Sequence, residues 1–280
     1  MILFTVDRNK CTGDGICAAE CPPRIIELSG KGSFPVPAEG AEELCIKCGH
    51  CVAVCPQGAL IHRDLKPEEC RPYVKEALFN VDQAEFFLLA RRSIRSYKDK
   101  PVDREDLKRL VNIASHAPTA HNLQPVHWLV IEDGKSVKHL AGLVVDWMKQ
   151  MLTMNPEVGR MLRFDSIVAQ WEGGVDRICR GAPHIVISHA KETALSAAEA
   201  CIGSLSYLEL AAHAMGLGSC WAGFVNAAAN MYPPVKSFLD LPEDHRCFGA
   251  VMVGHPKYRY HRIPVRNSTA VIWKQGTQTM

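Results

Sequence analysis

The chain has 280 residues, of which 47% are hydrophobic, so it can hold one substantial core and a small additional module. Its formal net charge of +2 argues against nucleic acid as the main partner. No uninterrupted apolar run is long enough to span a membrane, and the short apolar start at residues 1–6 has no basic leader, so we expect a cytoplasmic protein without a membrane partner.

Two related cysteine runs occupy the first 60 residues. The second run reads Cys-x-x-Cys-x-x-Cys-x-x-x-Cys-Pro, the spacing with which bacterial ferredoxins hold a cubane iron–sulfur cluster, and its cysteines are Cys45, Cys48, Cys51 and Cys55. A zinc site or a disulfide pair is the alternative, but zinc sites usually combine two separated Cys-x-x-Cys pairs. The first run repeats the second at a constant offset of 34 residues, with Cys11, Cys17 and Cys21. We therefore predict two clusters.

The predicted ligand sets cross over, because the fourth cysteine of each run in a two-cluster ferredoxin ligates the other cluster. One four-iron cluster is then held by Cys21, Cys45, Cys48 and Cys51. The other is held by Cys11, Cys17 and Cys55, with Asp14 at the position that Cys48 has in the second run. Carboxylate binds iron less firmly than thiolate. The run resembles ferredoxins that have aspartate at this position, and the resemblance implies either a 4Fe-4S cluster with Asp14 as a ligand or a 3Fe-4S cluster; a solvated Asp14 in a turn would also give the latter.

Residues 1–64 should form the ferredoxin-like iron–sulfur domain. Residues 58–62 read as a closing strand that pairs with residues 3–6. Prolines and charges in residues 65–80 indicate an ordered linker. Helical periodicity begins near Val81, which places the second domain at residues 81–280. Of the cysteines outside the two runs, we expect buried free thiols: Cys70, Cys179, Cys201, Cys220 and Cys247.

A dense basic segment follows the first helix of the second domain. It contains Arg91, Arg92, Ser93 and Arg95, and arginine forks beside a hydroxyl suit a phosphate monoester. A basic helix end that only complements the helix dipole is the alternative. The pattern then predicts a helix over residues 103–115 with Asp103 as its N-cap, a polar loop, and a strand over residues 128–131.

The C-terminal half contains a long apolar helix and a glycine-rich segment. The helix is predicted over residues 194–215, and because it has few charges and is apolar nearly all round, we expect it to be buried. Residues 185–187 and 248–253 read as core strands. The glycines at 216–223 favour a loop or a helix C-cap. The basic tail from residue 254 leads to a closing strand at residues 270–273.

The second domain resembles the nitroreductase family of FMN proteins over essentially all of residues 81–280. Three motifs carry the resemblance: Arg91-x-Ser93-x-Arg95, then Ala117-Pro118-Thr119 with Asn122-x-Gln124-Pro125, and finally Gly216 to Gly223. With the cysteine runs, the chain is similar to a ferredoxin-fused branch of that family. The resemblance implies an α+β fold, an FMN-binding α/β sandwich, and a homodimer in which the closing strand embraces the partner.

The resemblance also implies the cofactor-binding residues. The basic motif, including Arg92, would bind the FMN phosphate and ribityl chain, and Asn122 and Gln124 would lie along the flavin. Backbone amides near the flavin edge would come from Gly218, Ser219, Cys220, Trp221, Ala222 and Gly223. A tail cation, Arg262 or else Arg266, would meet the phosphate, although a solvated basic tail is the alternative. We assign no catalytic acid, because a histidine in a loop is more often structural.

These features predict an FMN oxidoreductase that reduces nitroaromatics, quinones or related electrophiles, with electrons delivered through the N-terminal clusters. The electron donor would be a one-electron carrier such as ferredoxin, or NAD(P)H, and the acceptor a small molecule. The alternative function is an electron-relay protein that converts one-electron into two-electron transfer for a partner complex.

Overall fold

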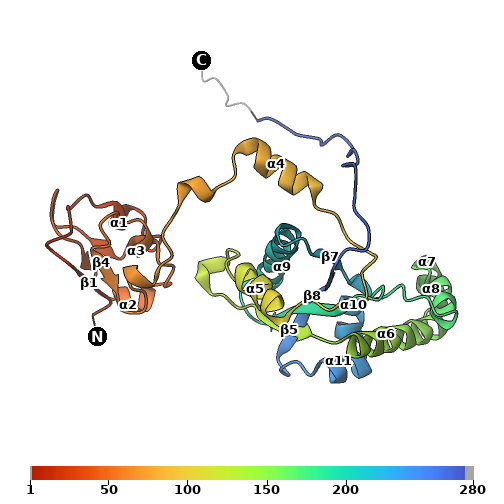
Figure 1. Ribbon diagram of the computed structural model, residues 1–280. Helices are drawn as coiled ribbons and strands as arrows, with labels where there is room; N and C mark the ends of the chain where they lie inside the picture. The colour runs from red at the N-terminus through yellow and green to blue at the C-terminus, as the bar shows by residue number, and fades with distance from the viewer. Residues whose placement is uncertain (1, 275–280) are drawn as a thin grey trace, which may run out of the picture.

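The computed structural model describes residues 2–274, and it consists of a small N-terminal module, a long connection and a larger domain (Figure 1). In the module, β1 (Phe4–Val6) pairs antiparallel with β4 (Leu60–His62), as the sequence predicts. A second hairpin joins β2 (Ile26–Glu27) to β3 (Val36–Pro37). The short helices are α1 (Ile16–Ala19), α2 (Ala41–Leu44) and α3 (His50–Ala53).

Glycine begins each of these short helices. Gly15, Gly40 and Gly49 stand at the N-caps with φ of 76°, 72° and 73°, in the left-handed region that side chains with a Cβ rarely adopt. Gly15 and Gly49 occupy equivalent places in the two cysteine runs. The repeat in the sequence is therefore also a repeat in backbone conformation.

The connection between the domains lies on the surface. It contains two single 3₁₀ turns, η1 (Pro67–Glu69) and η2 (Lys75–Ala77), and leads into α4 (Val81–Ala90). The N-terminus of α4 is capped in both directions: Asn80 Oδ1 accepts from the Gln83 amide at 2.9 Å, and Gln83 Oε1 accepts from the Asn80 amide at 3.1 Å. The helix has no buried residue, and it meets the larger domain through the Phe87 ring, whose centroid lies 5.1 Å from that of His213.

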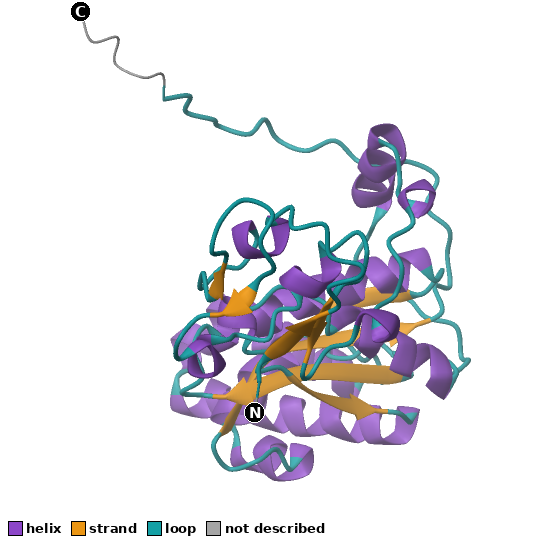
Figure 2. Ribbon diagram, turned by 90° about the vertical axis from the view of Figure 1, so that its left-hand side faces the viewer, coloured by secondary structure: helices purple, strands orange, loops and turns teal. Residues whose placement is uncertain are grey.

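The larger domain is built on one antiparallel sheet with helices on both faces (Figure 2). The order of its strands is β5-β6-β8-β7. The strands are β5 (His127–Ile131), β6 (His184–Lys191), β7 (Gly218–Trp221) and β8 (His245–Gly254). The helices and the third 3₁₀ turn are α5 (Arg104–Ala114), η3 (Ala120–Asn122), α6 (Gly134–Met154), α7 (Pro156–Met161), α8 (Phe164–Glu172), α9 (Ala197–Ala214), α10 (Gly223–Met231) and α11 (Pro233–Leu239).

Alternation along the central strands gives the domain two cores. Ile185 and Ile187 of β6 pack with α6 and α10, whereas Val186 packs with α5 and α9. The module has a separate core around Leu3, Phe4 and Leu60, which shares no residue with the other two clusters. No helix within residues 2–274 combines the length and the apolarity needed to cross a membrane.

The structure corrects several expectations. Helix α9 begins at Ala197, three residues later than predicted, because residues 192–195 form a turn and Ser196 adopts a positive φ of 52°. Residues 218–221 form strand β7 instead of a loop, because they pair with β8. Residues 270–273, expected to form a strand against the partner subunit, have no regular secondary structure in the single chain, and within residues 2–274 no strand lies beside them. Cys70 is exposed, and not buried as expected.

Candidate functional site

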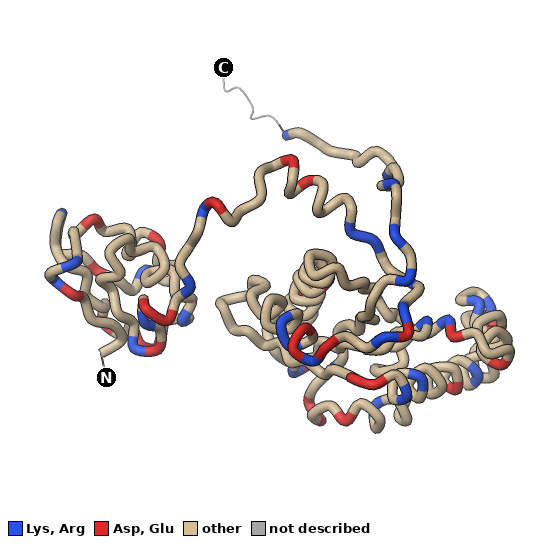
Figure 3. The backbone as a smooth tube through the Cα atoms, viewed as in Figure 1, with Lys and Arg blue, Asp and Glu red and all other residues tan. Residues whose placement is uncertain are grey.

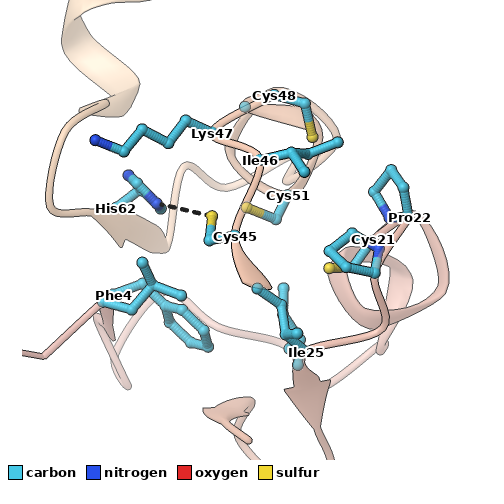
Figure 4. A pocket seen from close by; sticks show the side chains of 14 residues that line it. Phe4, Cys21, Pro22, Ile25, Cys45, Ile46, Lys47, Cys48, Cys51 and His62 are labelled. Carbon is cyan, nitrogen blue, oxygen red and sulfur yellow. Dashed lines mark hydrogen bonds between the residues drawn. The ribbon is translucent and has the colours of Figure 1, made fainter. Parts of the chain in front are cut away.

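Four cysteine thiols line a cavity in the N-terminal module (Figure 4). They belong to Cys21, Cys45, Cys48 and Cys51, the set predicted for the complete cluster. Cys21 comes from the end of α1, and the other three come from the loop before α3 and from α3 itself. The crossed arrangement therefore exists in the folded chain, since a cysteine of the first run joins three of the second.

The thiols of this cavity are close enough to influence one another. Burial, together with the neighbouring thiols of Cys21, Cys48 and Cys45, raises the pKa of Cys51 to about 11. Such crowding disfavours thiolates in the absence of a cation and is relieved when a metal binds them. The donor set and its surroundings thus fit an iron–sulfur cluster.

His62 is a residue of this cavity that the sequence reasoning missed. Its Nε2 lies 3.6 Å from Cys45 Sγ, and its Nδ1 accepts a hydrogen bond from the Asp64 amide at 3.0 Å. Because Nδ1 is the acceptor, the neutral ring carries its proton on Nε2 and directs it at the sulfur. Burial lowers the pKa of His62, which favours this neutral form. A hydrogen bond to a ligand sulfur is one of the factors that set cluster potential.

A second cavity is lined by the other predicted set: Cys11, Asp14, Cys17 and Cys55. Burial raises the pKa of Cys17, and the adjacent thiols of Cys55 and Cys11 add to that rise. The Asp14 carboxylate is already bonded within its turn: Oδ1 accepts from the Ile16 amide at 3.1 Å, and Oδ2 accepts from Thr12 Oγ1 at 2.9 Å. Asp14 therefore lines the cavity, and its carboxylate also accepts the hydrogen bonds that stabilise its own turn.

Neither cavity resembles a site for a single ion. Within residues 2–274, no group of three or more His, Cys, Asp or Glu side chains is arranged to hold one metal ion. The thiols of each set instead line a shared cavity. In a polynuclear cluster each thiolate binds a different iron, which requires ligands spread in this way.

In the larger domain, a buried carboxylate joins the first and third motifs. Glu209 of α9 accepts from Arg91 Nη1 at 3.4 Å and from Ser219 Oγ at 3.3 Å through Oε1. Its Oε2 accepts from Trp221 Nε1 at 2.9 Å. Glu209 is 8% exposed, so the network is shielded from water. The sequence reasoning missed Glu209 because it lies in the middle of an otherwise apolar helix.

The basic segment packs directly on β7. The Ile94 amide donates to the Ser219 carbonyl at 2.8 Å, and Ser93 forms a parallel bridge with Ser219. A Cβ on Gly218 would lie 2.7 Å from the Ile94 side chain, so this close approach requires glycine. Arg92 Nε is buried without a hydrogen-bond partner within residues 2–274, and Arg95 Nη1 lies 3.5 Å from the Ser93 carbonyl. A buried guanidinium donor of this kind fits an anion.

The C-terminal tail starts beside the same segment. The Lys257 amide donates to the Ser96 carbonyl at 3.0 Å, and the Lys98 amide donates to the His255 carbonyl at 2.9 Å. Figure 3 shows the positive charges of the segment and of the tail in the same region of the molecule. Arg262 and Arg266 are both exposed. The structure thus places the start of the tail beside the basic motif, but it does not distinguish Arg262 from Arg266 as the residue that would meet a phosphate.

The second motif forms a conformationally restricted loop after α5. His121, Asn122 and Gln124 have φ of 49°, 54° and 48°, in the left-handed region. The Gln124 amide donates to Thr119 Oγ1 at 3.1 Å. The Asn122 side chain is directed at the N-terminal module, where it donates to the Ile46 carbonyl at 3.2 Å and to the Lys47 carbonyl at 3.0 Å.

Three histidines gather where β5, β6 and β8 meet. His127 is opposite His189 in the sheet, and His189 Nδ1 lies 2.9 Å from His245 Nδ1. Burial, together with the imidazoles of His245 and His127, lowers the pKa of His189 to about 4. Asp244, whose Oδ1 lies 3.9 Å from His245 Nε2, is the nearby carboxylate.

This cluster predicts an acid-sensitive fold. In the unfolded chain His189 takes up a proton near pH 6.5, whereas in the folded chain it does so only near pH 4. The neutral, buried His189 therefore contributes to the free energy of unfolding above pH 6.5, and this contribution is lost as the pH falls to about 4. The loss amounts to about 3 kcal/mol of unfolding free energy. Urea unfolding of the wild type and of His189→Gln at pH 7 and pH 4.5 tests it. An equal pH dependence in both proteins would contradict the assignment.

Comparison with known proteins gives two family matches. Residues 88–255 match the model of the Nitroreductase family, and residues 10–60 match that of the 4Fe-4S dicluster domain. A protein of Archaeoglobus fulgidus named "Putative NADH dehydrogenase/NAD(P)H nitroreductase" is 27% identical over 170 residues, which is 61% of this chain and 83% of that protein. "Ferredoxin 7Fe" of Hydrogenibacillus schlegelii is 35% identical over 65 residues, which is 23% of this chain and 77% of that protein.

Solved structures agree on the fold of the larger domain. A nitroreductase with bound FMN from Bacteroides fragilis superposes with a TM-score of 0.57 at 20% identity, covering 70% of this chain and all of that one. A nitroreductase with bound FMN from Desulfitobacterium hafniense gives a TM-score of 0.55 at 17% identity, with coverage of 70% and 100%. The predicted nitroreductase-like fold with a ferredoxin-like domain is confirmed.

Proposed function

This chain belongs to the nitroreductase family, and from that premise we propose that it is an FMN-dependent oxidoreductase that reduces nitroaromatics, quinones or related electrophiles with electrons received through its N-terminal clusters. The observation that carries the proposal is the packing of the basic segment on β7. In the part of the chain that the structure describes, that packing leaves Arg92 Nε buried without a hydrogen-bond partner, within the segment predicted to meet a phosphate.

Several residues of this chain would hold FMN. Arg92, Ser93 and Arg95 supply donors for the phosphate, together with Arg262 or Arg266 from the adjacent tail. Glu209 orients Arg91 and Trp221, which fixes the segment relative to β7. Gln124 and the backbone of residues 218–223 are assigned to the flavin itself, whereas the Asn122 side chain, expected there from the sequence, donates to the Ile46 and Lys47 carbonyls of the N-terminal module. When bound, FMN supplies an acceptor of two electrons and the site of substrate reduction.

The N-terminal clusters would be held by the two ligand sets that line the cavities. When bound, the clusters supply one-electron carriers, so the donor is a one-electron protein such as ferredoxin, with NAD(P)H as a second possible source for the flavin. Such clusters need reduced cysteines, and we accordingly place the protein in the cytoplasm. We also propose the division into residues 1–64, 65–80 and 81–280.

The exposed apolar surface supports a homodimer. Helix α9 leaves Ile202 47% and Tyr207 40% exposed, although it is the most apolar long helix of the domain. Helix α4 exposes Phe86, and the tail exposes Ile272 and Trp273. A second copy of the chain would cover these surfaces and provide the neighbour that residues 270–273 lack. Sedimentation of the full-length protein as a monomer would contradict this.

An acceptor screen tests the function. Anaerobically purified protein is reduced through a low-potential ferredoxin and offered nitroaromatics and quinones under turnover conditions. The proposal expects catalytic consumption of at least one small acceptor with FMN retained. If no small molecule is reduced, and electrons leave only when one protein partner is added, the chain is an electron-relay protein.

The phosphate assignment makes a direct prediction about flavin affinity. Arg95→Ala and Arg92→Ala should each weaken FMN binding by about 1.5 to 3 kcal/mol, because each removes a charge-assisted donor to a phosphate. Both variants should purify pale. Arg104→Ala is the matched control, since Arg104 is 71% exposed and pairs with Glu132 on the surface. Equal FMN affinity in all four proteins, measured by fluorescence titration, would refute the assignment.

A further inference from the structure

One side chain of the larger domain reaches the wall of the first cysteine cavity. Asn122 Nδ2 donates to the carbonyls of Ile46 and Lys47, which lie between the ligands Cys45 and Cys48. Ile46 and Lys47 themselves line that cavity, and both are labelled in Figure 4. In Figure 1 the loop after α5 is the part of the larger domain that extends toward the module. The contact therefore joins a cluster-binding loop to the second nitroreductase motif.

Backbone strain is concentrated on both sides of this contact. Lys47 has φ 50°, and on the other side His121, Asn122 and Gln124 have φ between 48° and 54°. Residues other than glycine adopt this region at a cost, and they keep it where the surroundings over-determine it. The Lys47 side chain is also fixed by an ion pair, because its Nζ lies 2.9 Å from Oδ2 of Asp64, the last residue of the N-terminal module. The loop of Lys47 and the loop of Asn122 thus both have positive φ angles at the residues that meet in this contact.

The second cavity takes no part in the contact. It is lined by residues 6, 11–17, 35, 55–57, 59 and 60, and it shares none of them with the first. Asn122 therefore distinguishes the two ligand sets: the set of Cys45 and Cys48 faces the flavin domain, and the set of Asp14 does not.

We propose that Asn122 is a positioning residue that docks the Cys45–Cys48 loop on the flavin-binding domain and so makes the cluster of Cys21, Cys45, Cys48 and Cys51 the inner electron carrier. The cluster at Asp14 is then the outer one. This inference rests on the proposed function. Two molecules of a one-electron donor are oxidised, and their two electrons pass singly through the docked cluster and, with two protons, reduce one flavin.

The donor geometry gives a sharp test. Asn122→Ala removes both hydrogen bonds, and Asn122→Asp keeps the size but sets a carboxylate that cannot donate against two carbonyl oxygens. Two ordinary hydrogen bonds correspond to roughly a 30-fold preference for the docked loop. Asn112→Ala is the matched control, because Asn112 is exposed on α5, away from the contact.

Hydrogen–deuterium exchange of full-length protein provides a readout independent of turnover. Both Asn122 variants should exchange faster in residues 44–50 and unchanged in residues 11–18, whereas Asn112→Ala should match the wild type. Rapid mixing with reduced ferredoxin then follows flavin reduction per bound FMN, which should slow by up to about 100-fold in the variants, because small misplacements between reactants have effects of that size.

The outcomes separate the two proposals. Unchanged exchange at residues 44–50 in both Asn122 variants overturns the docking role, and so does flavin reduction at the wild-type rate. If the wild type binds no FMN, the proposed function fails, yet the exchange experiment still decides whether Asn122 holds the loop.

Discussion

Deletion of residues 1–64 is expected to abolish acceptor reduction driven by a one-electron protein donor, while FMN binding survives. The deletion removes both ligand sets, so transfer within one molecule is replaced by chance encounters, a loss of more than about 100-fold. The larger domain should remain folded, because its two cores share no residue with the core of the module. Anaerobic assays with reduced ferredoxin and with dithionite measure the two routes separately.

A point variant in the full chain controls for loss of the module. Cys48→Ser removes one ligand of the first cavity and should reduce ferredoxin-driven turnover almost as severely as the deletion. Cys70→Ser is the matched change, because Cys70 is exposed and lines neither cavity. The electron route would be wrong if the truncated protein accepted ferredoxin electrons as fast as the whole chain.

The cluster ligands could be predicted because they depend on local spacing. Three cysteines within seven residues can approach one another only if the chain turns around them, and the repeat then assigns Cys21 and Cys55 to opposite sets. The structure groups the thiols in that way. Helix α4 was equally predictable, since Asn80 and Gln83 form a local cap before an apolar run.

Contacts between distant segments could not be predicted. Glu209 and Arg91 are 118 residues apart in the sequence, and the residues next to either of them do not indicate that the two side chains form a pair. His62 reaches Cys45 from a strand that the sequence indicates only as a closing strand. The strand expected at residues 270–273 needs a neighbour, and because within residues 2–274 none lies beside it, a strand against a partner subunit stays a prediction.

Asp14 is the position where sequence and structure leave a chemical choice that experiment decides. It replaces the cysteine that the repeat requires, and it lines the second cavity with three thiols. Its carboxylate, however, accepts hydrogen bonds from Thr12 and from the Ile16 amide, which compete with iron for the same oxygens. We therefore expect the iron at this corner to be the first one lost.

Asp14→Cys should suppress the three-iron EPR signal that mild oxidation produces in the wild type. A thiolate holds iron more firmly than a carboxylate, so iron should rise from about seven to about eight atoms per chain. Asp7→Cys is the control, because it adds a thiol nearby that does not line the cavity.

Asp14→Asn separates the remaining alternatives. If the carboxylate is a ligand, this variant shows the three-iron signal even before oxidation. If Asp14 is only a turn residue, the spectrum of the variant is that of the wild type. Two oxidation-resistant four-iron clusters in the wild type would refute the labile corner, because all eight irons would then be held with equal firmness.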